Sequence, residues 1–203
     1  MRTLGYIFKN NQEWVEKQLS LNPDYFKRMT EGQRPDFLWI ACSDSRVLPN
    51  EMAGLGAGEM FVHRNIANLV QYNDINLLAV MQYAVDVLQV KHIVVCGHYG
   101  CGGVQASLGN TDLGIIDIWI RQIRDLATRH AEELKALTEE KDRVNRLVEL
   151  NVLQQVSNLE ELPVIKKARE RKQELFIHAW VFDMSTGRLS DLNQPEDAQA
   201  GNY

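Results

Sequence analysis

The sequence predicts an α/β protein: a mainly parallel central sheet of four strands plus a short edge strand, with helices on both faces and an N-terminal helical arm. Short apolar runs bounded by turn residues alternate with longer stretches of helical periodicity. Hydrophobic residues make up 45% and charged residues 24% of the 203 residues, which is globular composition at a length that one core can serve. We therefore expect a single domain, 1–203, with an arm (1–34), a core (35–110) and a third part of helices and C-terminal strands (111–203).

The N-terminal arm shows apolar residues at roughly helical spacing from Asn11 to Thr30. Pro23 and Asp24 interrupt this pattern and restart it. Two short helices are predicted.

The first half of the core alternates strands with a helix. FLWIA (37–41) and EMFVHR (59–64) are short apolar runs beside turn-forming residues, and HIVVC (92–96) is a third. Between the second and third runs, Asp74 is placed to cap a helix that carries apolar residues up to Leu88. This is the strand, helix, strand order of a parallel sheet.

The second half contains two more helical stretches, 115–137 and 142–159, and a fourth strand, LFIHAWVF (175–182). A turn at Thr186-Gly187 leads into a short partner strand near Leu189. The basic stretch KKARERK (166–172) is interrupted by a glutamate, which favours a solvated helix face over an anion site.

The charge balance excludes several classes of protein. Lys plus Arg total 22 against 27 Asp plus Glu, a net charge of −5, which disfavours a nucleic-acid partner. No apolar run approaches the roughly 18 residues that a membrane span needs. Lys9 interrupts the N-terminal apolar stretch before a signal-peptide core could form. We expect a soluble, cytoplasmic protein.

Its three cysteines are too few for a disulfide framework and raise the question of metal or thiol chemistry.

Two loops at predicted strand ends carry the chemistry. CSDSR follows the first strand and brings Cys42, Asp44 and Arg46, and GHYGCGG follows the third strand and brings His98 and Cys101. Ligands of parallel sheets collect at the carboxyl edge, so these side chains should converge. Cysteine and histidine are preferred zinc ligands, and two cysteines with one histidine leave a coordination position open for catalysis. The alternative is a purely structural role, in which the two cysteines pack as small buried hydrophobic residues and the histidine is a hydrogen-bonded loop residue.

Two neighbouring interpretations are less favoured. Cys96 lies inside an apolar strand, where a cysteine usually packs and does not bind a metal. CSDSR also invites comparison with the phosphatase loop, in which five residues separate the nucleophilic cysteine from its arginine. Here three residues separate Cys42 from Arg46, and a bound zinc would consume the thiolate.

The motifs CSDSRV, FVHRNIANLV and CGHYGCGGV resemble the beta class of carbonic anhydrases, densely from Phe37 to Val104 and more loosely to HAWVFD near the C-terminus. The resemblance implies one Zn²⁺ per subunit held by Cys42, His98 and Cys101. It implies reversible hydration of carbon dioxide to bicarbonate and a proton by hydroxide on the zinc, oriented by an Asp44/Arg46 dyad. It also implies a homodimer as the minimal unit, with N-terminal helices on the partner and active sites at the interface, and it leaves open whether two dimers pair into a tetramer.

Matching positions suggest a substrate pocket. By this resemblance its residues, some contributed by the neighbouring subunit, are Gln33, Phe61, Ile66, Tyr83 and the backbone at Gly102. The less favoured alternative is that the aromatic members, Phe61 and Tyr83, are ordinary core residues.

One branch of the family closes its site by moving the aspartate onto zinc, aided by a non-catalytic bicarbonate pocket built from a Trp, an Arg and a Tyr. Trp39 and Arg64 match the first two, but Phe182 replaces the tyrosine and Ala41 replaces a glycine. We therefore expect a vestigial bicarbonate site, with Asp44 paired to Arg46 and zinc carrying water or another exogenous ligand at neutral pH.

Three alternatives stay open at this point. A storage or sensor protein would close the site with Asp44 as fourth ligand. A second alternative keeps the zinc and the fold but hydrolyses carbonyl sulfide or carbon disulfide. A purely structural interaction domain would not need Asp44 and Arg46 beside the ligands.

Overall fold

The computed structural model describes residues 4–194, and the chain divides into two compact units with the boundary between Arg34 and Pro35. The N-terminal unit contains α1 (Gly5–Leu21) and α2 (Tyr25–Thr30), which confirms the two predicted helices. Trp14, Tyr25 and Phe26 join them through edge-to-face ring contacts with centroids 5.1 to 6.1 Å apart. α1 has no buried residue within this chain.

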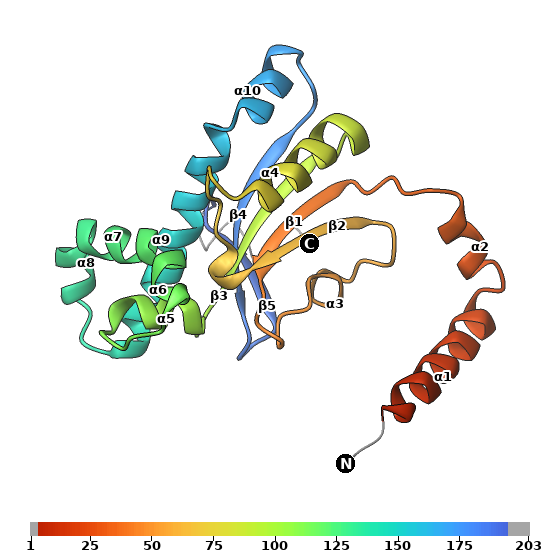
Figure 1. The fold of residues 1–203 in the computed structure, drawn as a ribbon, viewed down its shortest axis with the longest axis horizontal. Coiled ribbons are helices and arrows are strands. Elements are labelled where there is room, and N and C mark those ends of the chain that lie inside the picture. The colour runs from red at the N-terminus through yellow and green to blue at the C-terminus, as the bar shows by residue number, and fades with distance from the viewer. Residues whose placement is uncertain (1–3, 195–203) are drawn as a thin grey trace. The chain divides into compact units, whose positions relative to one another are not determined.

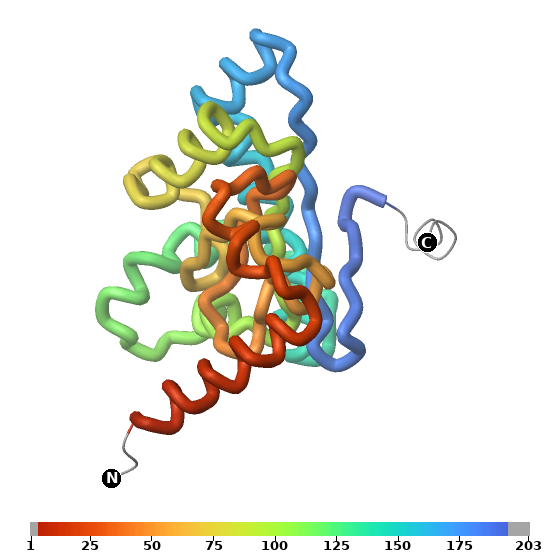
Figure 2. The backbone as a smooth tube through the Cα atoms, turned by 90° about the vertical axis from the view of Figure 1, so that its right-hand side faces the viewer, coloured from red at the N-terminus to blue at the C-terminus, as the bar shows by residue number. Residues whose placement is uncertain are grey.

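The second unit is built on one five-stranded sheet (Figure 1). The strand order is β2-β1-β3-β4-β5, and every neighbouring pair is parallel except β4 and β5. This confirms the predicted fold class. Figure 2 shows the blue hairpin of β4 and β5, which places β5 at one edge of the sheet. Gly187 turns this hairpin at a φ of 72°. The strand bounds are β1 Phe37–Cys42, β2 Met60–Asn65, β3 His92–His98, β4 Phe176–Asp183 and β5 Arg188–Asp191.

Two strands run further than the sequence indicates. β1 ends at Cys42, which pairs with Asn65 of β2, and β3 ends at His98, which pairs with Phe182 of β4. The ladder continues because a neighbouring strand offers backbone partners at these positions. Cys42 and His98 therefore lie on the last positions of regular strands and not in loops.

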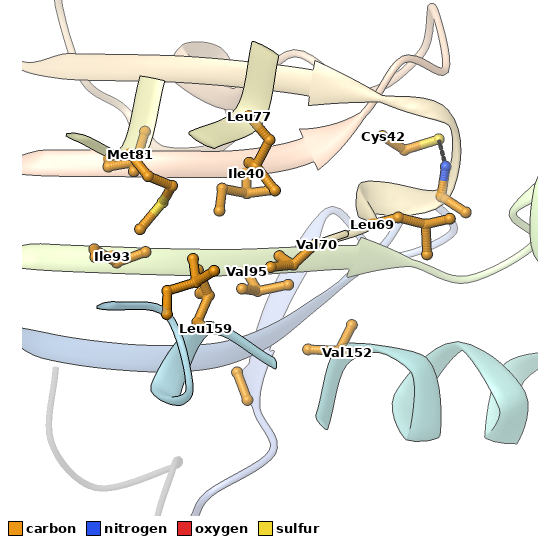
Figure 3. Packing of buried hydrophobic residues seen from close by; sticks show 14 of the residues in the cluster. Ile40, Cys42, Leu69, Val70, Leu77, Met81, Ile93, Val95, Val152 and Leu159 are labelled. Carbon is orange, nitrogen blue, oxygen red and sulfur yellow. Dashed lines mark hydrogen bonds between the residues drawn. The ribbon is translucent and has the colours of Figure 1, made fainter. Parts of the chain in front are cut away.

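One face of the sheet carries the main core. α4 (Ile75–Gln82) and α9 (Glu140–Glu160) pack their apolar side chains onto alternate residues of β1 and β3, as Figure 3 shows. Asp74 caps α4 as predicted, accepting hydrogen bonds from the amides of Asn76 and Leu77. The helix continues as a π-helical turn, η2 (Tyr83–Leu88). The labelled core residues are Ile40, Leu69, Val70, Leu77, Met81, Ile93, Val95, Val152 and Leu159.

The opposite face has a smaller cluster around Trp39, Val94 and Cys96, covered by α3 (Pro49–Ala53) and the loop that follows it. Helices thus lie on both faces, but very unequally. A helix as short as α3 is too brief to show apolar periodicity in the sequence. It is bounded by a proline at its start and by Gly54, in the left-handed conformation, at its end.

The predicted helix 115–137 is wrong as a single element. The structure has α6 (Ile115–Trp119), α7 (Arg121–Arg129) and α8 (Ala131–Lys135), separated at Ile120 and His130, where the backbone leaves helical ψ values. Bending at these points lets buried side chains of successive segments reach the core. α5 (Gly102–Leu108) was not predicted. α10 (Pro163–Glu170) exposes the basic stretch, as expected. No helix within residues 4–194 is long and apolar enough to cross a membrane.

Gly97 tests how closely α9 packs on β3. A Cβ atom at this position would lie 2.6 Å from Cγ2 of Val152 and 3.1 Å from Cγ1 of Val148. We expect Gly97→Ala to lower the free energy of unfolding by about 1–3 kcal/mol through overpacking, measured by urea denaturation. Gly109→Ala is the control, because its nearest neighbour would be an ordinary contact at 3.8 Å from the carbonyl oxygen of Ala106. Equal losses in both variants would contradict this account.

Candidate metal centre

The sheet topology brings the chemical residues to one place. β2 lies on one side of β1 and β3 on the other, so the connections that leave the carboxyl ends of β1 and β3 diverge. Such a switch point opens a crevice at the carboxyl edge of a parallel sheet. Cys42 is the last residue of β1 and His98 the last residue of β3, and both lie at this crevice. Cys101 follows β3 and occupies the N-cap position of α5.

Three buried side chains meet there. One potential ligand atom from each of Cys42, His98 and Cys101 lies within 4.8 Å of the others. The two sulfur atoms are 3.8 Å apart. Cys96 lies outside this group. Its sulfur is fully buried in the second cluster and contacts the carbonyl oxygen of Gly97, and burial raises the pKa of its thiol.

The His98 ring has a defined tautomer. Its Nδ1 lies 3.2 Å from the carbonyl oxygen of Tyr99, and a carbonyl can only accept, so Nδ1 carries the proton and donates. Nε2 then presents a lone pair. This atom is buried and has no hydrogen-bond partner within residues 4–194. A buried lone pair without a donor, facing two thiols, is what a metal ligand needs.

The two thiols are unequal. A hydrogen bond from the Cys101 thiol, supported more weakly by the amides of Ala67 and Asp44, lowers the pKa of Cys42 against the opposing effect of burial. The hydrogen bond to Cys42, burial and the charge on Cys42 raise the pKa of Cys101, although the amides of Val104 and Gly103 act in the other direction. A cation would bind both sulfurs as thiolates, and so would release the protons that they carry.

These residues fit Zn²⁺. Two Zn–S bonds of ~2.3 Å at a tetrahedral angle span about 3.8 Å, which matches the distance between the sulfur atoms. The third donor is a neutral imidazole nitrogen with its other nitrogen hydrogen-bonded to a carbonyl group, the usual arrangement for a histidine ligand. Soft thiolates with one imidazole are typical zinc donors.

Asp44 stands beside this group and is engaged elsewhere. Its Oδ1 accepts from Nε of Arg46 at 2.9 Å and its Oδ2 accepts from Nη2 at 2.7 Å, a bidentate pair. The backbone amide of Arg46 donates to Oδ1 as well. These bonds, led by the Arg46 side chain, hold the pKa of Asp44 well below its usual range. Oδ2 lies 3.9 Å from Nε2 of His98, so an ionised carboxylate borders the donor set.

Arg64 supports the chain under the site. Its Nε donates to the carbonyl oxygen of Cys42 at 2.9 Å and its Nη2 to that of Asp44 at 2.6 Å. Sequence reasoning placed Arg64 with Trp39 and Phe182 in a vestigial bicarbonate site. In the structure Trp39 is buried against Trp180 with ring centroids 5.4 Å apart, and Phe182 pairs with His98 across the β3–β4 ladder.

The predicted pocket residues come from several elements of the chain. The rings of Phe61 and Tyr83 contact each other with centroids 5.8 Å apart, and Tyr83 is 44% exposed. Ile66 follows β2 and is 37% exposed, and Gly102 is the exposed first residue of α5. Gln33 belongs to the N-terminal unit.

Sequence reasoning missed the groups that support the ligands. The Tyr99 carbonyl and the Ala67 amide act through the backbone, which no motif identifies. The polar residues that α9 turns inward, Asn151 and Gln155, are 1% exposed, and a hydrophilic interruption of the apolar helix face was the only available signal.

Fold and donor set together define an α/β protein with a Cys/His/Cys group that could hold a metal ion. The sequence model for carbonic anhydrase matches residues 37–189. A carbonic anhydrase of Emericella nidulans is 49% identical over 192 residues, covering 95% of this chain and 84% of that protein. The chain belongs to the carbonic anhydrase family, in its beta class, and is an enzyme of that family, as the sequence motifs predicted.

Solved structures agree with this assignment. One is from a study of two tetrameric beta-carbonic anhydrases of Sordaria macrospora, with a TM-score of 0.91, 40% identity and coverage of 96% of this chain and 98% of that one. Another is a Coccomyxa beta-carbonic anhydrase in complex with acetazolamide, with a TM-score of 0.91, 35% identity and coverage of 98% and 92%.

The Asp44–Arg46 pair gives a testable pKa. We expect Arg46→Gln to raise the pKa of Asp44 toward its ordinary value of 3.8, measured by ¹³C NMR titration of the metal-free protein. A lowered pKa contributes stability above the unfolded-state pKa and loses it as pH falls, so the variant should be less stable at neutral pH and match the wild type in strong acid. Because Arg46 is 61% exposed, the difference should stay below about 1 kcal/mol. Arg121→Gln, on an exposed residue of α7, should change neither quantity.

Proposed function

We propose that this enzyme uses Zn²⁺ held by Cys42, His98 and Cys101 to hydrate carbon dioxide reversibly to bicarbonate and a proton. The observation that carries the proposal is the donor set itself: two sulfur atoms at tetrahedral spacing and an imidazole lone pair, all buried at the switch point of the sheet. Membership of the family supports the reaction, because the relatives are named carbonic anhydrases.

The protein supplies three ligands and leaves one coordination position free. Zinc in such a site supplies hydroxide from water at neutral pH. Two thiolates neutralise the charge of the ion, which weakens its pull on water compared with a site of neutral ligands. Groups that draw negative charge away from the sulfurs or fix the nucleophile therefore matter more here.

Asp44 is the group that orients the nucleophile. Arg46 keeps its carboxylate ionised and pointed by two parallel hydrogen bonds. An ionised carboxylate oxygen 3.9 Å from Nε2 of His98 would accept a hydrogen bond from the water-derived nucleophile that a bound zinc would supply, and would orient it toward the substrate. Arg46 acts through Asp44.

The closed-site alternative requires Asp44 to become a fourth ligand. In the structure both of its oxygens accept hydrogen bonds from Arg46, and it lies outside the group of three donors. This supports the open, catalytic site. Carbon dioxide is small and apolar, and we assign its pocket to Phe61, Ile66 and Tyr83 with the amide of Gly102. Gln33 joins this assignment as a polar contact, since some of the pocket residues come from the neighbouring subunit of the proposed dimer.

We also propose assembly into a homodimer that can pair into a tetramer. The Sordaria macrospora structure is described as tetrameric. In the second unit of this chain large apolar side chains remain exposed at Tyr72, Ile75, Ile115 and Ile118. Exposed apolar groups of this kind are typical of an interface with another subunit.

Removing a metal ligand should remove the metal. We expect Cys42→Ser, His98→Ala and Cys101→Ser each to lose most bound zinc and all measurable hydration activity, because two remaining ligands hold the ion far more weakly. Cys96→Ser should keep both, since Cys96 lies outside the donor group. Zinc is measured by elemental analysis and hydration by stopped flow. The ligand assignment is wrong if Cys96→Ser loses zinc while Cys101→Ser keeps it.

Removing the orienting pair should separate activity from metal content. We expect Asp44→Asn and Arg46→Ala to keep nearly full zinc occupancy but to lower kcat/KM by at least about tenfold, because they act beside the metal and not as its ligands. The two substitutions combined should cost little more than Asp44→Asn alone, since Arg46 acts through Asp44. A fully metallated Arg46→Ala protein with wild-type activity would remove the pair from the mechanism.

A further inference from the structure

The peptide group between Ile66 and Ala67 connects a tryptophan to a metal ligand. Its N–H, on Ala67, donates to Sγ of Cys42 at 3.4 Å, the dashed line in Figure 3. Its C=O, on Ile66, accepts from Nε1 of Trp119 at 2.8 Å. Because the C=O and N–H of a trans peptide point in opposite directions, this one planar group is hydrogen-bonded to the Trp119 indole on one side and to the Cys42 sulfur on the other.

The residues that follow are fixed by side-chain amides. Nδ2 of Asn151 donates to the carbonyl oxygen of Ala67 at 3.0 Å, and Oε1 of Gln155 accepts the Val70 amide at 2.8 Å. The side chain of Asn65 bonds both the amide and the carbonyl of Leu69. The loop therefore satisfies its buried backbone groups through side chains and not through a strand or helix ladder.

The loop also holds an uncommon conformation. Ala67 and Asn68 have positive φ angles of 62° and 48°, which side chains other than glycine adopt at a cost. Gly103 of α5 leaves room for it, since a Cβ there would lie 2.7 Å from Cγ2 of Ile66 and 3.3 Å from Cβ of Ala67. A strained segment fastened from several sides indicates that the orientation of its peptide groups matters.

We propose that Trp119 is a positioning residue for the metal site, acting through the Ile66–Ala67 peptide to aim an N–H at the Cys42 thiolate, while Asn151 holds the following peptide by its Ala67 carbonyl. The inference rests on the proposed function. The hydrogen bond from the indole to the Ile66 carbonyl polarises the peptide group. The Ala67 N–H then becomes a stronger hydrogen-bond donor, because hydrogen bonds in series reinforce one another. An N–H···S bond draws electron density from the sulfur, so the thiolate gives less charge to zinc. This counteracts the weakening that two thiolates impose on the ion.

Trp119→Phe tests the relay because it removes the indole donor and keeps an aromatic ring. Trp180→Phe is the matched control, since Nε1 of Trp180 is buried and has no hydrogen-bond partner among the described residues. Both proteins are loaded with Co²⁺, and the thiolate-to-metal charge-transfer band is recorded. Exchange of the Ala67 amide hydrogen is followed by NMR in the loaded and metal-free proteins.

We expect Trp119→Phe to shift the charge-transfer band to longer wavelength, because a sulfur without its donor is richer in electrons. The Ala67 amide should exchange roughly tenfold faster or more, and kcat/KM should fall roughly tenfold, because a sulfur that gives more charge to zinc weakens its pull on water. Asn151→Leu should change the band in the same direction. Trp180→Phe should change none of these quantities.

The proposal is overturned if Trp119→Phe leaves the band and the Ala67 exchange rate at wild-type values, or if Trp180→Phe changes them equally. Failure of the proposed function gives a different result: the wild type would bind neither Zn²⁺ nor Co²⁺. In that case exchange at Ala67 in the metal-free protein would still decide whether Trp119 orients the peptide. If Trp119→Phe does not fold, the same two measurements on Trp119→Leu, which also lacks the indole donor, decide.

Discussion

The parallel hydrogen-bond ladder at the centre of the sheet is the constraint on which the site depends. β1 and β3 are neighbours, and both run long enough to carry Cys42 and His98 to the same carboxyl edge. Cys101 needs only three further residues and the start of α5 to join them. A slip by one residue in either strand would turn its ligand to the opposite face, because side chains alternate. The tight packing of α9 on Gly97, one residue before His98, helps to hold that register.

Hydrogen-bond donors surround the negatively charged groups that the sheet brings together at the site. The sulfur of Cys42 faces the amides of Ala67 and Asp44, and that of Cys101 faces the amides of Gly103 and Val104. The charge of the Asp44 carboxylate is balanced by Arg46, and Arg64 donates hydrogen bonds to the carbonyl oxygens of Cys42 and Asp44. Such compensation is necessary because an isolated thiolate or carboxylate is costly to bury. Backbone donors are suited to the task, since they cost no side-chain entropy when the fold has already fixed them.

The helix α9, which covers the main core, both stabilises the sheet and positions a loop of the site. The main core, between β1, β3 and the long helix α9, gives the strands their rigidity. The same helix also turns Asn151 and Gln155 inward to fasten the loop that carries Ala67. Buried amides in an otherwise apolar interface cost stability unless every group is paired, and here they are paired with each other and with the loop backbone. Stability and placement of the site therefore come from one element.

The sequence by itself determined the class of fold, the elements with strong periodicity and the donor residues, because apolar spacing, Asp74 as a cap and the Cys/His spacing are local properties of the chain. It did not determine the breaks at Ile120 and His130, the short helices α3 and α5, or the true ends of β1 and β3, because those depend on which partners the packed sheet supplies. Only the tertiary structure decided the tautomer of His98 and the donor to Cys42, since both come from backbone groups whose identity no side chain reveals. It also brought Trp119 to the Ile66 carbonyl, 53 residues away in the chain, and local pattern carries no information about contacts at that separation.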